Sequence, residues 1–139
     1  MTLVIDASVA LKWFLDEDGS DRAAALLDGK ELLIAPDLIV AEVCNAGWKA
    51  VRAGTALPQQ LEVMAARLPV VLDELVPLAN LAPDAVAAAL ALDHPVYDCC
   101  YLVLASQRQA HLVTADRRLL ARVAGTRWDA GVVALSNSV

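Results

Sequence analysis

The chain has 139 residues, of which 58% are hydrophobic but only 4% aromatic, and its mean hydropathy is +0.52. A chain of this length is expected to form a single domain, spanning residues 1–139, with a large core of Leu, Val and Ala. Its 17 acidic and 11 basic residues give a formal net charge of −6, which argues against binding nucleic acid through a broad basic surface.

Short strand-like runs alternate with longer helical runs along the sequence. Residues Leu3 to Ile5 predict a first strand, and a helix is expected to follow after Ser8. In chain order, the pattern then predicts a helix from Ser20 or Asp21 to Leu27, a strand over 32–35 and a helix from 36–37 to about Ala53. Three further helices are expected, from Pro58 to about Leu68 and ending before Pro69, from Pro83 through Leu92, and from Tyr97 to Gln107. The last predicted elements are a strand over 112–114, a helix from Asp116 to Val123 and a strand over 132–135. The stretch 70–78 fits either the end of a helix or a strand, and residues 136–139 are expected to fray.

This alternation predicts an α/β fold with a central, mostly parallel sheet of about four to five strands, covered by helices on both faces. No internal repeat, low-complexity tract or linker divides the chain. In such a sheet, ligands bind beyond the carboxyl ends of the strands, at the point where the strand order reverses. Side chains that follow strands are therefore the first candidates for a functional site.

The N-terminal residues and the cysteines favour a cytoplasmic protein. Residues 1–6 contain no basic leader and no cleavage region, and they are interpreted as the start of the first strand. No uninterrupted apolar stretch reaches the ~18 residues of a membrane span. Cys44, Cys99 and Cys100 lack Cys-x-x-Cys spacing, so we expect reduced core cysteines and not a disulfide framework or a zinc site.

Four acidic residues lie at the edges of otherwise apolar segments: Asp6, Glu42, Asp98 and Asp116. Asp6 and Asp116 come after strand-like runs, Asp98 lies at the start of a helix, and Glu42 lies about one turn into another. Carboxylates are seldom buried unless they are paired or bound to metal. Because strand ends and helix starts share one rim of a parallel sheet, we expect the four acids to converge. The 17 acids less these four leave 13 against 11 bases, so much of the excess negative charge belongs to this set.

Each acid also has a purely structural interpretation. Asp98 and Asp116 could cap the helices that begin beside them, and Asp6 could satisfy a turn. Glu42 is no cap, and its helical neighbours are apolar, while Asn45 lies three residues on and on the same helical face. Four separate structural explanations are harder to accept than one shared site, which the sequence therefore favours.

Clustered carboxylates repel each other, and a hard divalent cation such as Mg²⁺ or Mn²⁺ removes that repulsion because it prefers carboxylate and water oxygens. An all-carboxylate site of this kind suits the attack of water on a phosphodiester, in which the cation activates water and stabilises developing charge. Ser8 and Thr114 each stand two residues from an acid. Their hydroxyl groups could orient carboxylates or water, or could simply bond the start of a helix.

The histidines and the basic residues near the acids can be interpreted without a role in the site. His94 and His111 are isolated in the sequence and are interpreted as structural or surface residues, not as zinc ligands. Lys12, Arg117 and Arg118 could touch substrate phosphates, but solvated surface charge is the favoured interpretation of each one taken alone.

The segments that carry the four acids resemble those of a known family. The segments are VIDASVALKWF at 4–14, APDL through AEV with Asn45 at 35–45, YD at 97–98, and LVTADRRL at 112–119. Together they closely resemble the corresponding segments of PIN-domain proteins of the VapC toxin type. The resemblance spans almost the whole chain in the expected order, and the set is specific although no single segment is.

This resemblance implies a PIN-like fold in a single domain over 1–139 and a Mg²⁺- or Mn²⁺-dependent endoribonuclease. Its implied catalytic acids and metal ligands are Asp6, Glu42, Asp98 and Asp116, with Ser8, Asn45 and Thr114 supporting. It also implies a toxin that cleaves cellular RNA, a homodimer, and a cognate antitoxin protein that covers or enters the acidic groove. Cys99 and Cys100 stand where small or apolar residues are usual, a departure that affects no catalytic position.

Three other functions compete with the ribonuclease. A phosphatase of the haloacid-dehalogenase kind would use Asp6 as its nucleophile, but it needs a second Asp where Ser8 stands. A receiver-like phosphoacceptor would need an early acidic pair and a Lys after a late strand, and neither is evident. A catalytically silent PIN-like module that acts only through a partner is the remaining alternative, which the presence of all four acids disfavours.

Overall fold

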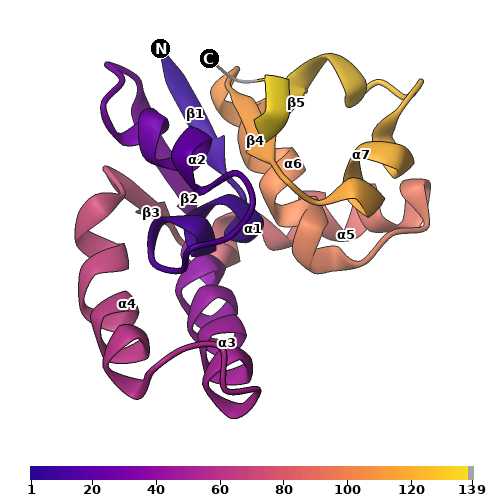
Figure 1. Ribbon diagram of the computed structural model, residues 1–139. Coiled ribbons are helices and arrows are strands. Elements are labelled where there is room, and N and C mark those ends of the chain that lie inside the picture. Colours follow the sequence, from indigo (N-terminus) through magenta and orange to yellow (C-terminus); the bar gives the residue numbers. More distant parts are fainter. Residues whose placement is uncertain (138–139) are drawn as a thin grey trace.

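The computed structural model describes residues 1–137 and contains a five-stranded sheet in which every strand pair is parallel (Figure 1). The strands are β1 (Thr2–Ile5), β2 (Leu32–Pro36), β3 (Glu74–Val76), β4 (His111–Thr114) and β5 (Val132–Ala134), in the order β3-β2-β1-β4-β5. The predicted α/β fold with a parallel sheet of four to five strands is therefore confirmed.

Seven α-helices flank the sheet within the described residues. They are α1 (Ala7–Ala10), α2 (Ser20–Leu27), α3 (Leu38–Arg52), α4 (Pro58–Val71), α5 (Ala82–Leu92), α6 (Val96–Arg108) and α7 (Arg117–Val123), joined by the 3-10 helices η1 (Leu11–Trp13), η2 (Leu78–Asn80), η3 (Asp129–Gly131) and η4 (Leu135–Asn137). Helix α6 packs against β1, β2 and β4, and every residue from Cys99 to Ala105 is buried. No single helix of residues 1–137 is long and apolar enough to span a membrane, although α5 and α6 together, bent by 114°, would suffice by length and composition.

Helix α4 is longer than the sequence predicts. The prediction that it ends before Pro69 is wrong, because α4 continues to Val71, and the ambiguous stretch 70–78 holds both the helix end and β3. A proline removes one backbone donor and is most disruptive in a helix interior. Pro69 lies in the last turn and is exposed, while Leu68 and Leu72 on either side are buried and keep this turn packed. The other predicted elements agree with the structure to within about two residues, and residues 138–139 of the expected frayed end lie outside the described residues.

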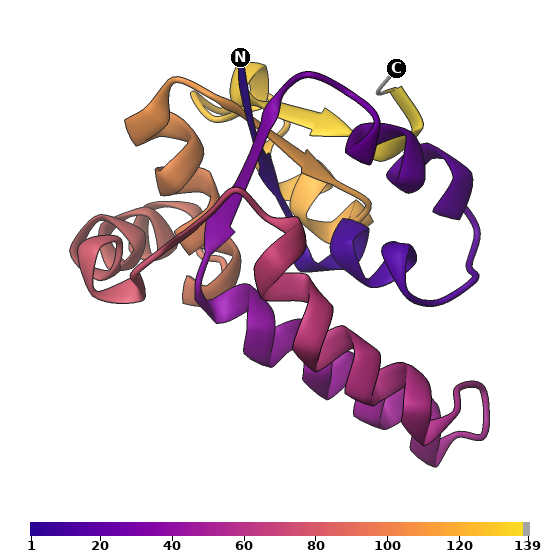
Figure 2. The ribbon, with the colours of Figure 1, turned by 90° about the vertical axis from the view of Figure 1, so that its left-hand side faces the viewer.

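Helices α3 and α4 form a hairpin that projects from the sheet (Figures 1 and 2), and a glycine lies at their closest approach. A Cβ atom on Gly47 would lie 2.6 Å from Sδ of Met64 and 3.1 Å from Cδ1 of Leu61. Because Met64 is fully buried, the two helices approach more closely than a larger residue would allow. Helix α3 carries Glu42 in its second turn, so this close packing involves the helix that holds one of the four acids.

All three cysteines are free. Cys99 and Cys100 are buried core residues as predicted, whereas Cys44 is only half-buried. Burial, with a smaller contribution from the charge of Asp98, raises the pKa of the Cys99 thiol to about 11. A thiol with so high a pKa is protonated at neutral pH, and the thiolate is the reactive form of cysteine. The Cys99 thiol is therefore not a candidate nucleophile.

Candidate functional site

The strand order of the sheet reverses beside β1. From β1 the chain adds β2 and β3 on one side, and it later places β4 and β5 on the other. The carboxyl ends of β1 and β4 thus flank the kind of switch point where α/β sheets bind ligands. Asp6 follows β1 directly and Asp116 lies two residues after β4, while Glu42 comes from α3 and Asp98 from the first turn of α6. We refer to Asp6, Glu42, Asp98 and Asp116 as the acidic rim.

Asp6 is buried and held by two hydroxyl groups. Its Oδ2 accepts hydrogen bonds from Oγ of Ser8 at 2.5 Å and from Oγ1 of Thr114 at 2.9 Å. The same two hydroxyl oxygens accept hydrogen bonds from the backbone N–H groups of Ala115 and Asp116, both at 3.0 Å. This network joins the ends of β1 and β4, so the turn that carries Asp116 is anchored to Asp6.

Burial raises the pKa of Asp6 above its ordinary value, because surroundings of low dielectric disfavour the charged carboxylate. The hydrogen bonds from Ser8 and Thr114 oppose this rise, whereas the negative charges of Asp98 and Asp116 add to it. Two other members of the acidic rim therefore lie close enough to Asp6 to repel it. A cation bound beside Asp6 would lower its pKa, and would thus oppose the effects of burial and of the neighbouring negative charges.

Glu42 is held by a residue that the sequence argument did not single out. Oη of Tyr101 donates a hydrogen bond to Oε1 of Glu42 at 2.6 Å, across 59 residues of sequence. Burial raises the pKa of Glu42, the Tyr101 hydrogen bond lowers it, and the charges of Asp6 and Asp98 raise it further. Tyr101 itself is fully buried. The available sequence signal was a tyrosine one turn after Asp98 in an otherwise apolar run.

Asp98 has a histidine partner. Nε2 of His94 lies 2.6 Å from Oδ2 of Asp98, and only 9% of the His94 side chain and 22% of the Asp98 side chain are exposed. The interpretation of His94 as an isolated structural or surface residue missed this contact. His94 lies outside α6, before its N-cap Pro95, so the helical spacing rule does not predict this contact, and only the short separation along the chain could have suggested it. Asp98 caps no helix, since α6 has Pro95 at its N-cap.

Asp116 is the N-cap of α7. Its Oδ1 accepts hydrogen bonds from the backbone N–H groups of Arg118 at 2.9 Å and Leu119 at 3.4 Å. The capping role that the sequence left open for Asp116 is therefore present. That role does not separate Asp116 from the other acids, because its charge still contributes to the raised pKa of Asp6.

One oxygen of each rim carboxylate has no hydrogen bond within residues 1–137. The bonded oxygens are Oδ2 of Asp6, Oε1 of Glu42, Oδ2 of Asp98 and Oδ1 of Asp116. Every buried side-chain N or O atom of the described residues has a partner, so the second oxygen of Asp6 keeps some contact with solvent. Carboxylate oxygens are the donors that Mg²⁺ and Mn²⁺ prefer. In the part of the chain that the structure describes, no three His, Cys, Asp or Glu side chains are grouped so as to hold a metal ion as they stand, so binding would require the side chains to draw together.

Asn45, which the sequence placed beside Glu42, does not hold any of the four carboxylates. Its residue is exposed, and the rim carboxylates bond to other groups. It lines a hollow of about 440 Å³ together with Glu42, Lys49 and Tyr97. Asn45 is therefore placed to contact a ligand beside Glu42, not to orient the acid itself.

Two larger hollows border the acidic rim on either side of α7. One, of about 610 Å³, is lined by the segment 93–95 before α6, by residues of α7, and by Asp98 and Asp116 themselves. The other, of about 570 Å³, is lined by Thr114 and by residues of η1, α2 and α7. The acids are thus open to a ligand much larger than a single ion.

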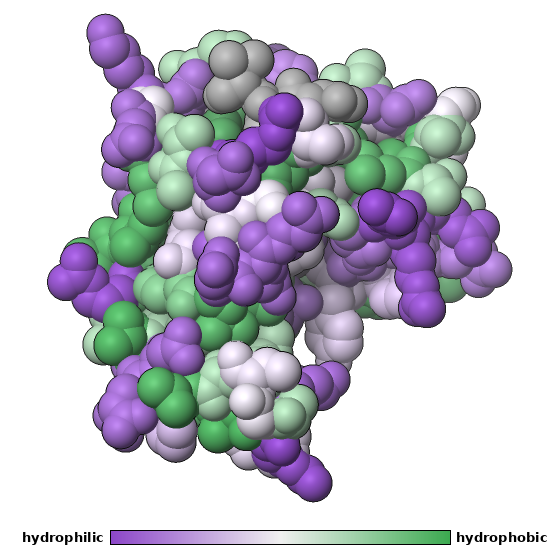
Figure 3. Space-filling view, in the orientation of Figure 1, coloured by the Kyte–Doolittle hydropathy of each residue, from purple (hydrophilic) through white to green (hydrophobic). Residues whose placement is uncertain are grey.

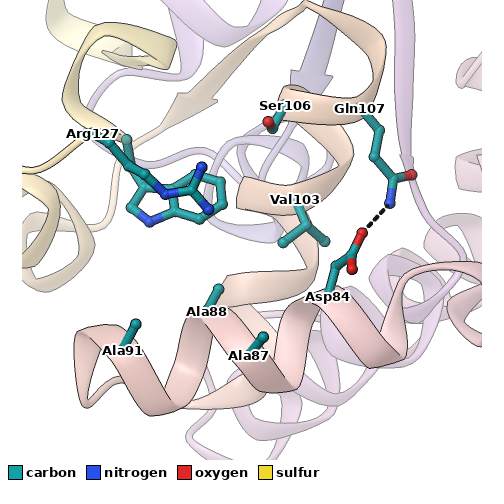
Figure 4. Close-up of a pocket in the computed structure, with 9 residues that line it drawn as sticks. Asp84, Ala87, Ala88, Ala91, Val103, Ser106, Gln107 and Arg127 are labelled. Atoms are coloured by element: carbon teal, nitrogen blue, oxygen red, sulfur yellow. Dashed lines mark hydrogen bonds between the residues drawn. The ribbon is translucent and has the colours of Figure 1, made fainter.

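A separate hollow of about 310 Å³ lies between α5, α6 and the segment before η3 (Figure 4). At one side of it, Nε2 of Gln107 donates to Oδ2 of Asp84 at 3.1 Å. At the other, the Arg127 guanidinium lies 4.1 Å from the centroid of the Trp128 ring. No member of the acidic rim lines this hollow, so it forms no part of the candidate site.

Comparisons with known proteins agree with one another. Residues 3–126 match the family described as PIN domain. Over 121 residues the chain is 32% identical to Ribonuclease VapC3 from Pyrobaculum aerophilum, and this match covers 86% of the chain and 92% of that protein. Among solved structures, PAE2754 from Pyrobaculum aerophilum is similar with a TM-score of 0.71 and 22% identity, over 98% of this chain and 85% of that one. The structural similarity concerns the fold alone.

Proposed function

Because this chain belongs to the PIN-domain family and is similar to a VapC-type ribonuclease, we propose that it is an endoribonuclease that hydrolyses phosphodiester bonds of cellular RNA. The proposal includes a divalent cation, Mg²⁺ or Mn²⁺, as the cofactor. It also includes a single PIN domain made of all 139 residues. The acidic rim provides the physical argument for the activity.

The observation that carries the proposal is the buried carboxylate of Asp6 among other acids. Burial and the charges of Asp98 and Asp116 all disfavour its charged form. No Lys or Arg side chain in the described part of the chain bonds to it to compensate. A carboxylate in such surroundings is explained if a cation joins it, because a nearby positive charge favours the ionised form.

The ligands that we propose for the cation are the unbonded oxygens of Asp6, Glu42 and Asp98, with Asp116 joining directly or through water. When bound, such a cation lowers the pKa of the attacking water and balances the charge that develops on the phosphate and the leaving oxygen. Asp116 is the least secure of the four ligands, because its Oδ1 is already engaged in capping α7 and only its other oxygen remains for the cation.

Four neighbouring side chains orient the carboxylates. The pairs are Ser8 and Thr114 with Asp6, Tyr101 with Glu42, and His94 with Asp98. Partners of this kind restrict the rotation of a ligand side chain, and they are commonly as important to metal affinity as some ligands. We propose that their role here is to keep the second oxygen of each carboxylate turned toward the site.

We further propose that the protein is the toxin of a toxin–antitoxin pair and acts in the cytoplasm. Its proposed partners are RNA, a cognate antitoxin protein that covers the acidic rim, and a second copy of the chain in a homodimer. The similarity to Ribonuclease VapC3 supports this context. Expression of the chain alone should arrest growth, and a small open reading frame directly upstream should encode a protein that relieves the arrest.

The test of the activity is cleavage of a structured RNA by the purified, antitoxin-free protein. We expect cleavage with Mg²⁺ or Mn²⁺ and none in EDTA. Asp6→Asn and Asp98→Asn should each lose most of the activity while remaining folded. Asp28→Asn is the matched control, because Asp28 is an exposed acid at the end of α2, and it should cleave like the wild type.

Two results would contradict the proposal. Equal cleavage by Asp98→Asn and Asp28→Asn would show that the acidic rim is not the site. Absence of both cleavage and divalent-ion binding, the latter measured by calorimetric titration, would favour the alternative of a catalytically silent PIN-like module that acts through a partner protein.

A further inference from the structure

We propose that α7 places positive charge on both sides of the acidic rim. In this arrangement Arg117 contacts one backbone phosphate of an RNA strand, and Arg118 and Arg122 contact phosphates on the other side of the cut. The inference rests on the proposed ribonuclease function, and it adds the residues that hold the strand.

The first hollow lies between α7 and α2 at the carboxyl ends of β4 and β5. Its charged lining residues are Lys12, Arg22 and Arg117, with Asp18 and Asp21. Thr114 also lines it, and the same Thr114 hydroxyl donates to the buried Oδ2 of Asp6. An RNA strand lying in this hollow would therefore pass beside Asp6, the first acid of the rim.

The second hollow lies between α7 and the start of α6. Its charged lining residues are Arg118 and Arg122, with Asp93, Asp98 and Asp116. These two arginines are four residues apart and share one face of the helix, whereas Arg117 lies about 100° around the helix axis from Arg118. Helix α7 thus separates the two hollows and presents basic side chains to each.

The three arginines of α7 are exposed, and their guanidinium groups make no ion pair or hydrogen bond within residues 1–137. Elsewhere, Arg108 is bound to Glu74, and Nζ of Lys12 lies 3.4 Å from Oε1 of Glu17. A phosphate could therefore bind to the α7 arginines without breaking an existing ion pair. In Figure 3, which has the orientation of Figure 1, hydrophilic residues interspersed with hydrophobic ones cover the side of the molecule on which Figure 1 labels α7.

The charge distribution gives these arginines a specific importance. RNA that approaches the rim meets four carboxylates in a chain of net charge −6, so binding depends on local cations. Five of the 11 basic residues line the two hollows beside the rim, and α7 supplies three of the five. Basic residues are thus gathered where an RNA strand must pass to reach the acids, among the acidic lining residues Asp18 and Asp21 of the first hollow and Asp93, Asp98 and Asp116 of the second.

The test measures binding of a single-stranded RNA oligonucleotide that spans a cut site of the wild-type protein, with Asp6→Asn present throughout to prevent cleavage. Each phosphate contact to a single strand contributes about 0.7 to the slope of log affinity against log salt. We expect Arg117→Gln to lower that slope by about 0.7 and the double variant Arg118→Gln, Arg122→Gln by about 1.4. Lysine at the same positions should restore most of the slope, because it keeps the charge.

A second measurement locates the contacts. Single uncharged methylphosphonate linkages are placed at successive positions of the oligonucleotide, on both sides of the cut. Linkages on one side should lose their effect on affinity in Arg117→Gln, and linkages on the other side should lose theirs in the Arg118, Arg122 double variant. Arg67→Gln is the matched control, since Arg67 is exposed on α4 and lines neither hollow.

The outcomes separate this inference from the proposed function. If the wild type cuts RNA but the α7 variants bind it with unchanged affinity and salt slope, the α7 contacts are wrong and the ribonuclease stands. Sensitive linkages on the same side of the cut for both variants would also overturn the division by α7. If the wild type cuts no RNA, the ribonuclease and the α7 contacts both fail.

Discussion

Carboxylates occur in two opposite electrostatic situations in this molecule, at the acidic rim and at Glu74 on the edge strand β3. At the rim, burial raises the pKa values of Asp6 and Glu42, and neighbouring acids raise them further. At the edge strand, the two guanidinium nitrogens of Arg108 donate to both carboxylate oxygens of Glu74, at 2.9 Å and 2.6 Å. Those hydrogen bonds hold the pKa of Glu74 below its usual value.

The difference separates an acid that is paired within the protein from acids whose charge is not balanced by a basic partner. The Glu74–Arg108 pair favours the charged form of both partners, although each is 40% exposed or more, so its contribution is small. The charged forms of Asp6 and Glu42 are instead disfavoured, because both side chains lose contact with solvent and lie near other carboxylates. Under the proposed function a bound cation would favour those charged forms, which is the behaviour expected of a metal site and not of a structural ion pair.

The largest expected effect compares Glu42→Gln with Glu74→Gln. Glutamine at position 42 keeps an oxygen that can accept the Tyr101 hydrogen bond, but it removes the charge. Loss of a metal ligand removes several kcal/mol of transition-state stabilisation, so we expect cleavage of RNA to slow by about 100-fold or more. Glu74→Gln should cleave at the wild-type rate. Similar initial rates for the two variants would end the distinction between the two kinds of acid.

A smaller effect is expected from Tyr101→Phe, which removes one hydroxyl group from a fully buried ring. Without its donor, the carboxylate of Glu42 is free to rotate, and outer partners of this kind are commonly worth about 10-fold or more in activity or metal affinity. We expect the Mn²⁺ concentration for half-maximal cleavage to rise about 10-fold. Tyr97→Phe, at an exposed tyrosine next to Asp98, is the control and should leave that concentration unchanged. A change in the maximal rate at saturating Mn²⁺, without a shift in that concentration, would point to a structural effect instead.

Asp6→Asn should stabilise the protein when no metal is present. The pKa of Asp6 is higher in the folded protein than in the unfolded chain, so its contribution to stability is fully present below the unfolded pKa and is lost as the pH rises through the folded pKa. Thermal midpoints in EDTA should therefore be higher for Asp6→Asn than for the wild type at neutral pH, and should converge as the pH falls toward about 4. Adding Mg²⁺ should raise the wild-type midpoint more than that of the variant. A lower midpoint for Asp6→Asn at neutral pH would contradict the assigned repulsion.

The smallest expected effect is that of Glu74→Gln on stability. The pKa of Glu74 is lowered in the folded protein, so its contribution is present above the unfolded pKa and is lost as the pH falls through the folded pKa. Because the ion pair is exposed, urea unfolding at neutral pH should show a loss of no more than about 1 kcal/mol. The loss should shrink in high salt. A loss that persists in acid would mean that the side chain contributes through packing and not through its charge.

Local sequence signals predicted most of the fold correctly. Glycine or proline lies near several helix ends, as at Gly54 after α3, Pro58 at the start of α4 and Pro95 before α6, and the alternation of strands and helices indicates a parallel sheet without any knowledge of contacts. The exception is Pro69, where the local signal for a helix end was overridden by the burial of Leu68 and Leu72. That burial depends on residues distant in sequence, so no local pattern contains it.

In the candidate site, too, some contacts could be predicted from local sequence and others could not. Asp6 and Asp116 could be placed together from sequence because each follows a strand of a parallel sheet, and Ser8 and Thr114 lie close to them along the chain. The contact of Glu42 with Tyr101 could not, because it joins two helices across 59 residues and depends on how α3 and α6 are rotated against each other. Asn45 is a second example of a contact that local sequence could not predict. It lies on the same face of α3 as Glu42, but its side chain bonds to none of the four carboxylates.

By itself, the sequence determined the order of the elements and the class of sheet, and it singled out the four acids that we propose for the site, because strand ends and helix starts are local features that converge in any parallel sheet. Only the tertiary structure decided which oxygen of each acid is hydrogen-bonded, and which neighbours raise or lower the pKa values of Asp6 and Glu42. Those properties follow from distances of a few ångströms between separate elements, set by packing of the whole core. The arginines of α7 belong to the same class, since only the fold shows that adjacent residues of one helix face two different hollows.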